Sequence, residues 1–151
     1  MESIFKTWKR SREIYLEYFD SYTLEQLNKV PEGFSNNLIW NIGHVIVAQQ
    51  GLIYKTSGLE TYVSKELYER YKSGTKPSQQ ISEAEVSELK EFLVSLIEKT
   101  ESDFFEGIFV TFNERMTGTG FHLGSLKDAF EFNNYHEGVH LGLMMNIRKF
   151  V

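Results

Sequence analysis

The chain has 151 residues, 41% of them hydrophobic and 15% aromatic, with a formal net charge of −5 at pH 7 and no Cys. A chain of this length buries roughly 68–70% of its unfolded surface, so one domain over residues 1–151 is expected. Without Cys, the chain has no disulfides, no thiolate metal ligands and no cysteine nucleophile. Scattered Lys and Arg argue against nucleic-acid binding, while the lack of a signal-peptide pattern and of any apolar run near ~18 residues predicts a cytoplasmic protein without a membrane partner.

An aromatic stripe predicts the first long helix, over residues 3–22. Its members recur at spacings of three, four and seven, which places them on one face of a helix. They are Phe5, Trp8, Tyr15, Phe19 and Tyr22. Arg12 interrupts the stripe, and its side chain is expected either to snorkel to solvent or to face a polar cavity.

A second long helix is predicted from a cap at Asn36 or Asn37 to about Tyr54, after a short helical turn over residues 24–27 and a loop over residues 29–36. Its sequence is apolar almost all the way round, unlike the one-sided pattern of a surface helix. We therefore expect this helix to lie buried in the middle of the fold.

The middle of the chain is less regular until a third long helix begins after Ser82. A short helix is predicted over residues 65–72, and a loop follows over residues 73–78. Ser82 and Glu85 have the spacing of a capping box, and Gly107 is a candidate for the end of the helix. The apolar stripe of this helix consists of Val86, Leu89, Leu93, Leu96, Ile97 and Phe104.

Residues 108–112 look strand-like, and the glycines of residues 118–120 interrupt any regular structure nearby. A short hairpin or an extended loop is therefore expected over residues 108–122, with His122 interpreted as a loop residue. Ser125 is placed to cap a final helix that runs to the C-terminus. Four long amphipathic helices in one domain predict an all-α protein with an antiparallel four-helix bundle.

The most informative stretch is on this final helix, where His136 and His140 are four residues apart. Residues at this spacing share one helix face, with Cβ atoms roughly 5–6 Å apart. That face also carries Ala129, Phe132, Asn133, Leu143, Ile147 and Phe150. We therefore expect the histidine face to be the core face, where imidazoles need hydrogen-bond partners or a metal ion because unpaired buried polar groups are costly.

His44 on the second helix is the candidate for a third ligand. It shares a face with Trp40, Asn41, Ala48 and Gly51, and the small residues among these leave room beside the imidazole. A bundle can bring this histidine opposite the pair on the final helix, and three neutral imidazoles with an open position are typical of a catalytic zinc-type site. The alternative is that the histidines are structural residues with ordinary hydrogen bonds.

Residues 136–140 also match the H-E-x-x-H motif of zinc peptidases. Such enzymes usually take a third ligand from downstream, but no Asp, Glu or His follows His140. Glu137 lies about 100° around the helix from His136. We favour a helix-surface carboxylate for Glu137 over a catalytic base or a group that orients a ligand, so a metallopeptidase is the least favoured function.

Gly138 and Gly142 lie on the side of the final helix away from the histidines. Glycine costs a helix about 1 kcal/mol relative to alanine, so a pair of glycines usually has a packing reason. We expect a neighbouring helix or a second subunit to approach closely here.

The chain resembles the DinB-like family, also described as YfiT-like putative metalloenzymes. The resemblance runs nearly full length and is carried by residues 40–44 (WNIGH), 125–128 (SLKD) and 136–142 (HEGVHLG). It implies an up-down-down-up four-helix bundle with one divalent metal ion, nickel or zinc, held by His44, His136 and His140. It also implies a homodimer. Characterised relatives include thiol-dependent transferases and isomerases that use bacillithiol, mycothiol or glutathione.

These observations favour metal-assisted chemistry on a small molecule, either a low-molecular-weight thiol used as a nucleophile or water activated for hydrolysis. Arg12 and Tyr15 are candidates to meet a substrate anion. Four amides are candidates to orient the ligands, as groups in the second layer around a metal often do. They are Asn41, Gln49, Gln50 and Asn133. The rival interpretation is a non-catalytic dimeric bundle with structural histidines or an idle metal.

Overall fold

The computed structural model describes residues 1–151, most of which are helical. The long helices are α1 (Glu2–Ser21), α3 (Leu38–Ile53), α5 (Glu83–Phe105) and α6 (Leu126–Ile147). The shorter helical elements are α2 (Leu24–Asn28), η1 (Lys55–Ser57), α4 (Lys65–Tyr71) and η2 (Arg148–Phe150). The two short strands are β1 (Arg115–Met116) and β2 (His122–Leu123). The prediction of an all-α chain is confirmed.

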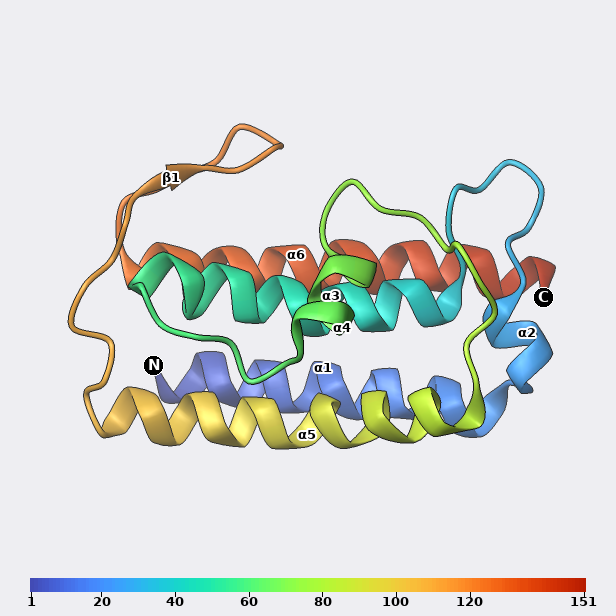
Figure 1. Cartoon of the computed structure of the whole chain (residues 1–151), viewed down its shortest axis with the longest axis horizontal. Coiled ribbons are helices and arrows are strands. Elements are labelled where there is room, and N and C mark those ends of the chain that lie inside the picture. Colours follow the sequence, from blue (N-terminus) through green and yellow to red (C-terminus); the bar gives the residue numbers. More distant parts are fainter.

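The four long helices run alongside one another (Figure 1). Helix α1 packs against α5 and α6, and α3 packs against α6 and α5. The colours of Figure 1 show that α1 and α6 run in one direction and that α3 and α5 run in the other. The short helices α2 and α4 both pack against α3, so this helix is covered on nearly every side.

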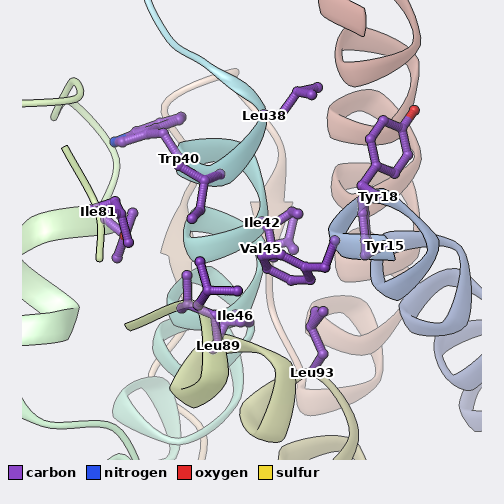
Figure 2. Packing of buried hydrophobic residues seen from close by; sticks show 14 of the residues in the cluster. Tyr15, Tyr18, Leu38, Trp40, Ile42, Val45, Ile46, Ile81, Leu89 and Leu93 are labelled. Atoms are coloured by element: carbon purple, nitrogen blue, oxygen red, sulfur yellow. The ribbon is translucent and has the colours of Figure 1, made fainter. Parts of the chain in front are cut away.

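Burial of α3 follows from its sequence. Every residue of α3 except Ala48 is buried, as its all-round apolar pattern predicts. Figure 2 shows Val45 and Ile46 of α3 together with Tyr15 of α1 and Leu89 of α5, and all four belong to the largest hydrophobic cluster. A polar side chain on α3 is therefore surrounded by packed neighbours that restrict its position.

The predicted helix caps are formed, with one difference. The side chain of Asn37 accepts a hydrogen bond at the start of α3, and Ser125 does so at the start of α6. Ser82 likewise caps α5 by accepting from the Glu85 backbone N–H. The second half of the expected capping box is missing, because the Glu85 carboxylate binds Arg70 and the hydroxyl of Tyr71 instead.

The segment before α6 forms a hairpin, but its strands do not include residues 108–112. β1 and β2 pair antiparallel with only two residues each. Ile108, Phe109 and Phe112 pack against a second hydrophobic cluster that surrounds Phe5. Burial against the helices therefore explains the strand-like composition of this stretch better than strand pairing does.

The glycines of α6 have no close neighbour. A Cβ atom built on Gly138 or Gly142 meets nothing within 4 Å, so the expected close approach of another helix of this chain is wrong. The expected homodimer stays a prediction. No helix in the structure is both long enough and apolar enough to span a membrane.

Candidate metal centre

Three imidazoles from two helices meet at one point. His44 of α3 lies beside His136 and His140 of α6, and each offers a ligand atom that lies within 4.8 Å of the other two. The Nε2 atoms of His44 and His136 are 3.2 Å apart. The helix pairing thus brings together the three histidines that the sequence singles out.

The orientation of His44 is fixed by a backbone carbonyl. Its Nδ1 lies 2.6 Å from the carbonyl oxygen of Tyr71, and because a carbonyl can only accept, Nδ1 must carry the proton. The lone pair of the neutral ring is then on Nε2. This contact depends on Gly43, since a Cβ there would lie 2.5 Å from the Tyr71 ring. The indole of Trp40 stacks on the imidazole with a centroid distance of 4.8 Å.

The orientation of His140 is fixed by an amide. Its Nδ1 lies 2.7 Å from Oδ1 of Asn41. The Asn41 amide nitrogen donates to Asn36 Oδ1 and to the carbonyl of Asn37, which leaves its oxygen as the acceptor. His140 therefore also carries its proton on Nδ1 and presents the Nε2 lone pair toward the cluster.

His136 completes the cluster without a fixed tautomer. Its Nδ1 is buried and has no hydrogen-bond partner. Burial and the neighbouring imidazoles lower the pKa of His136 to about 4 and that of His140 to about 3, and burial also lowers the pKa of His44. All three rings are therefore neutral near pH 7. A group of neutral imidazoles with two Nε2 lone pairs directed at one point fits a divalent cation.

Glu137 lies in the core, so the expectation of a helix-surface carboxylate is wrong. Its side chain is 1% exposed and forms an ion pair with Arg12, whose Nη2 lies 2.7 Å from Oε1. The amide of Asn133 donates to the same oxygen, and the Tyr15 hydroxyl donates to the Glu137 backbone carbonyl. The charge is buried because a guanidinium and an amide replace the lost water.

The core face of α6 therefore differs from the predicted one. The buried residues of this helix are Ala129, Phe130, Asn133, Glu137, Met144 and Ile147, whereas His136 and His140 are only half-buried. Ala129, Asn133 and Ile147 belong to both the predicted and the observed face, whereas Phe130, Glu137 and Met144 each lie one position, or 100°, beyond a residue of the predicted face. The helix is therefore rotated by less than one residue relative to the prediction. The histidines lie on a flank that faces α3.

The other polar candidates have different surroundings from those expected. Arg12 is occupied by Glu137 and by the carbonyl of Val45, and Tyr15 is fully buried. Neither lines the cavity described below, and their contact with a substrate stays a prediction. Two of the candidate amides, both on α3, hydrogen-bond to residues other than the histidines. Gln49 donates to Thr100 of α5, and Gln50 donates to Gln49. Among the four candidate amides, Asn41 alone contacts a histidine.

A cavity of about 360 Å³ opens beside the cluster. Its floor combines His44 and His136 with apolar and small side chains of α3 and α6. The full lining is His44, Val47, Ala48, Gly51, Leu52, Tyr68, Lys72, Ser73, Arg115, Thr117, Gly118, Thr119, Phe132 and His136. The room predicted beside His44 is therefore present, and the cavity is large enough for a small-molecule ligand.

One wall of the cavity comes from the hairpin. Arg115 and the turn residues Thr117 to Thr119 line it, which assigns a place to the segment 108–122. His122 itself is exposed and lies 3.0 Å from the Glu114 carboxylate, outside the cluster. Sequence reasoning missed Tyr68, Lys72 and Arg115, and the small residues Ala48 and Gly51 gave the only signal of open space.

The comparison with known families agrees with the geometry. The family model of the DinB superfamily matches residues 7–144. This range includes the three histidines, all of α3 and α5, and most of α1 and α6. No curated protein matches the chain. The match spans most of the sequence, and the chain belongs to the DinB superfamily.

Proposed function

We propose that His44, His136 and His140 hold one divalent metal ion, nickel or zinc, and that the protein is a metal-dependent enzyme acting on a small molecule in the adjoining cavity. One observation carries the proposal. Two of the imidazoles have protonated Nδ1 atoms held by oxygen acceptors, so their Nε2 lone pairs converge, and two of the three histidines also line the cavity.

A divalent ion bound here supplies Lewis acidity, which lowers the pKa of a coordinated thiol or water molecule. The residues of the chain hold the imidazoles and shape the substrate space. Tyr71 and Asn41 keep His44 and His140 in the ligand tautomer. Phe132, whose ring stacks on His136 at a centroid distance of 5.9 Å, provides an apolar wall.

Thiol-dependent transfer is the first reaction class to test, and hydrolysis is the second. The chain has no Cys, so any thiol nucleophile must belong to a substrate. The cavity is open enough for two small reactants to meet beside the histidines. A peptidase mechanism loses support, because the Glu137 carboxylate is bound by Arg12 and Asn133 and does not line the cavity.

The first experiment measures the metal content of untagged protein by elemental mass spectrometry. Wild type is expected to carry close to one equivalent, and His44→Ala to carry almost none. His122→Ala is the matched control, because His122 is an exposed histidine outside the cluster, and it should keep its metal. Absence of metal from wild type, even after nickel or zinc is added, would refute the proposed site.

The second experiment tests catalysis. Metal-loaded protein is assayed with a model electrophile in the presence and absence of added thiol, and with an ester panel. Activity should require the thiol and should be lost in His140→Ala. Metal bound at one equivalent with no turnover of either panel would favour the rival interpretation of a non-catalytic bundle.

A further inference from the structure

We infer that the cavity beside the histidines binds an oxyanion of its substrate, a carboxylate or a phosphate, through Arg115, Tyr68 and Lys72. The inference deepens the proposed function, on which it rests, by naming a substrate class. The inferred substrate is a small molecule with an anionic end at the hairpin, an apolar body, and a reacting group near the histidines.

The charged side chains that line the cavity are all positive. Lys72 and Arg115 are its two formal cations, and no Asp or Glu is among the lining residues. Lys72 is partly neutralised by Glu69, with 2.5 Å between Nζ and Oε2. Arg115 forms no ion pair and no side-chain hydrogen bond. Its planar guanidinium is therefore free to bind an oxyanion with two parallel N–H donors.

Tyr68 adds a neutral donor to the same wall. Its hydroxyl has no partner in the protein and is not sealed from the cavity. It lies so close to α3 that a Cβ on Gly51 would be 2.5 Å away, so the glycine makes room for it. Burial raises the pKa of Tyr68, and the charge of Arg115 lowers it. Arg115 and Tyr68 line the same cavity, and the phenol stays protonated near pH 7 and can donate.

The phenol ring is itself fixed. Lys55 Nζ lies 3.3 Å from the centroid of the Tyr68 ring, a cation–π contact that restricts the motion of the ring. A hydroxyl held in this way costs little ordering when it binds a ligand.

The apolar part of the lining comes from the same two helices as the histidines. Val47, Ala48 and Leu52 come from α3, and Phe132 comes from α6. These side chains favour a hydrocarbon or aromatic body over a fully polar ligand. The anion-binding residues belong instead to α4, its C-terminal flank and the hairpin, so they can be changed without touching the histidines.

Benzoate is a suitable probe, and benzamide is its uncharged match. Both are titrated into ¹⁵N-labelled protein as purified and again after chelation of metal, with NMR shift changes as the readout. Benzoate is expected to bind with a dissociation constant near ~1 mM, to shift signals of residues 115–119 and of Tyr68, and to bind at least about tenfold more tightly than benzamide.

Variants separate the subsite from the metal centre. Arg115→Gln should weaken benzoate binding about tenfold or more, and Tyr68→Phe should weaken it by a smaller factor. Lys127→Gln is the control, because Lys127 is an exposed cation of α6 that does not line the cavity, and it should leave binding unchanged. All three variants should retain the wild-type metal content.

Any of four results would overturn the inference. The first three are no binding of millimolar benzoate to wild type, equal affinities for benzoate and benzamide, and binding that is insensitive to Arg115→Gln. Binding abolished by chelation alone would assign the carboxylate to the metal and would also overturn it. If chelated protein binds benzoate but the chain never takes up metal, the subsite stands and the proposed function fails.

Discussion

Arg12 of α1 and Glu137 of α6 form an ion pair inside the protein, with 2.7 Å between Nη2 and Oε1 and side chains that are 2% and 1% exposed. Glu137 directly follows the metal-ligand candidate His136 in sequence. Because its carboxylate points into the core, the adjacent imidazole is turned toward α3. The ion pair thus sets the rotation of α6 on which the three-histidine cluster depends.

Removing one partner of this pair is expected to be strongly destabilising. Glu137→Gln leaves the Arg12 guanidinium buried without a counter-charge, which costs about 3–5 kcal/mol in comparable buried pairs. Urea denaturation measures the free energy of unfolding. Glu131→Gln is the control, because Glu131 pairs with Lys127 on the surface and should cost less than about 1 kcal/mol. Similar losses in the two variants would contradict the assigned role.

The stability of the metal-free protein should fall in mild acid. The folded-state pKa of His136 is about 4 and that of His140 about 3, compared with 6.5 for a histidine exposed to water. As the pH falls below about 6.5, these two histidines therefore bind protons in the unfolded chain but not in the folded one. This contribution to stability is fully present above that pH and is lost progressively toward pH 4 and below. Because each pKa unit corresponds to about 1.4 kcal/mol, the loss amounts to a few kcal/mol.

Carboxylates titrate in part of the same range, so the histidine contribution needs its own comparison. The double variant His136→Gln and His140→Gln lacks these two groups, and its stability should vary less between pH 6.5 and pH 5. Urea denaturation of both proteins across this range gives the difference. Parallel pH profiles would show that the imidazoles are not held neutral.

Gly43→Ala should disturb the metal centre without altering a ligand. The new Cβ would lie 2.5 Å from the Tyr71 ring, which is buried and cannot swing away. Moving that ring displaces the carbonyl that binds His44, so we expect a loss of about 1–3 kcal/mol in stability and a fall of about tenfold in metal affinity. Thermal denaturation and a competitive metal titration measure the two effects.

A second glycine supplies the matched control for this substitution. Gly138→Ala adds the same methyl group to α6, where nothing lies within 4 Å. Alanine should then stabilise the helix by about 0.5–1 kcal/mol and leave metal affinity unchanged. Destabilisation by both substitutions would mean that the space around Gly138 is filled, for example by a second subunit.

The tautomer of His140 can be tested at Asn41. Asn41→Leu removes the oxygen that accepts from Nδ1, whereas Asn41→Asp keeps an acceptor while losing the same amide donors. Metal affinity should fall about 10–100-fold in the leucine variant and remain near wild type in the aspartate variant. Equal losses in both would attribute the effect to the bonds with Asn36 and Asn37 rather than to the imidazole.

Local chemistry explains why so much of the fold could be predicted. The caps at Asn37 and Ser125 are short-range features, and the all-round apolar sequence of α3 required burial. The meeting of His44 with His136 and His140 also followed, because only two helices had to pack together for three ligands to converge.

The rotation of α6 could not be predicted in the same way. A helical wheel assigns charged residues to solvent, and Glu137 is buried only because Arg12, 125 positions away, binds its carboxylate. The cavity wall was missed for a related reason. Tyr68 and Arg115 carry no local pattern, and they line one cavity only after α4 and the hairpin have packed near α3 and α6.

The separation of the histidines along the chain has a mechanical consequence. His44 and His136 are 92 positions apart, so a metal ion held by both closes a long covalent loop in a chain that has no disulfide. A cross-link over about 90 residues restricts the unfolded chain by on the order of 4–5 kcal/mol in the loop-entropy account. If the proposed site is filled in the cell, the supply of metal would also govern the lifetime of the folded protein, and cells short of the ion would hold a chain more open to proteolysis.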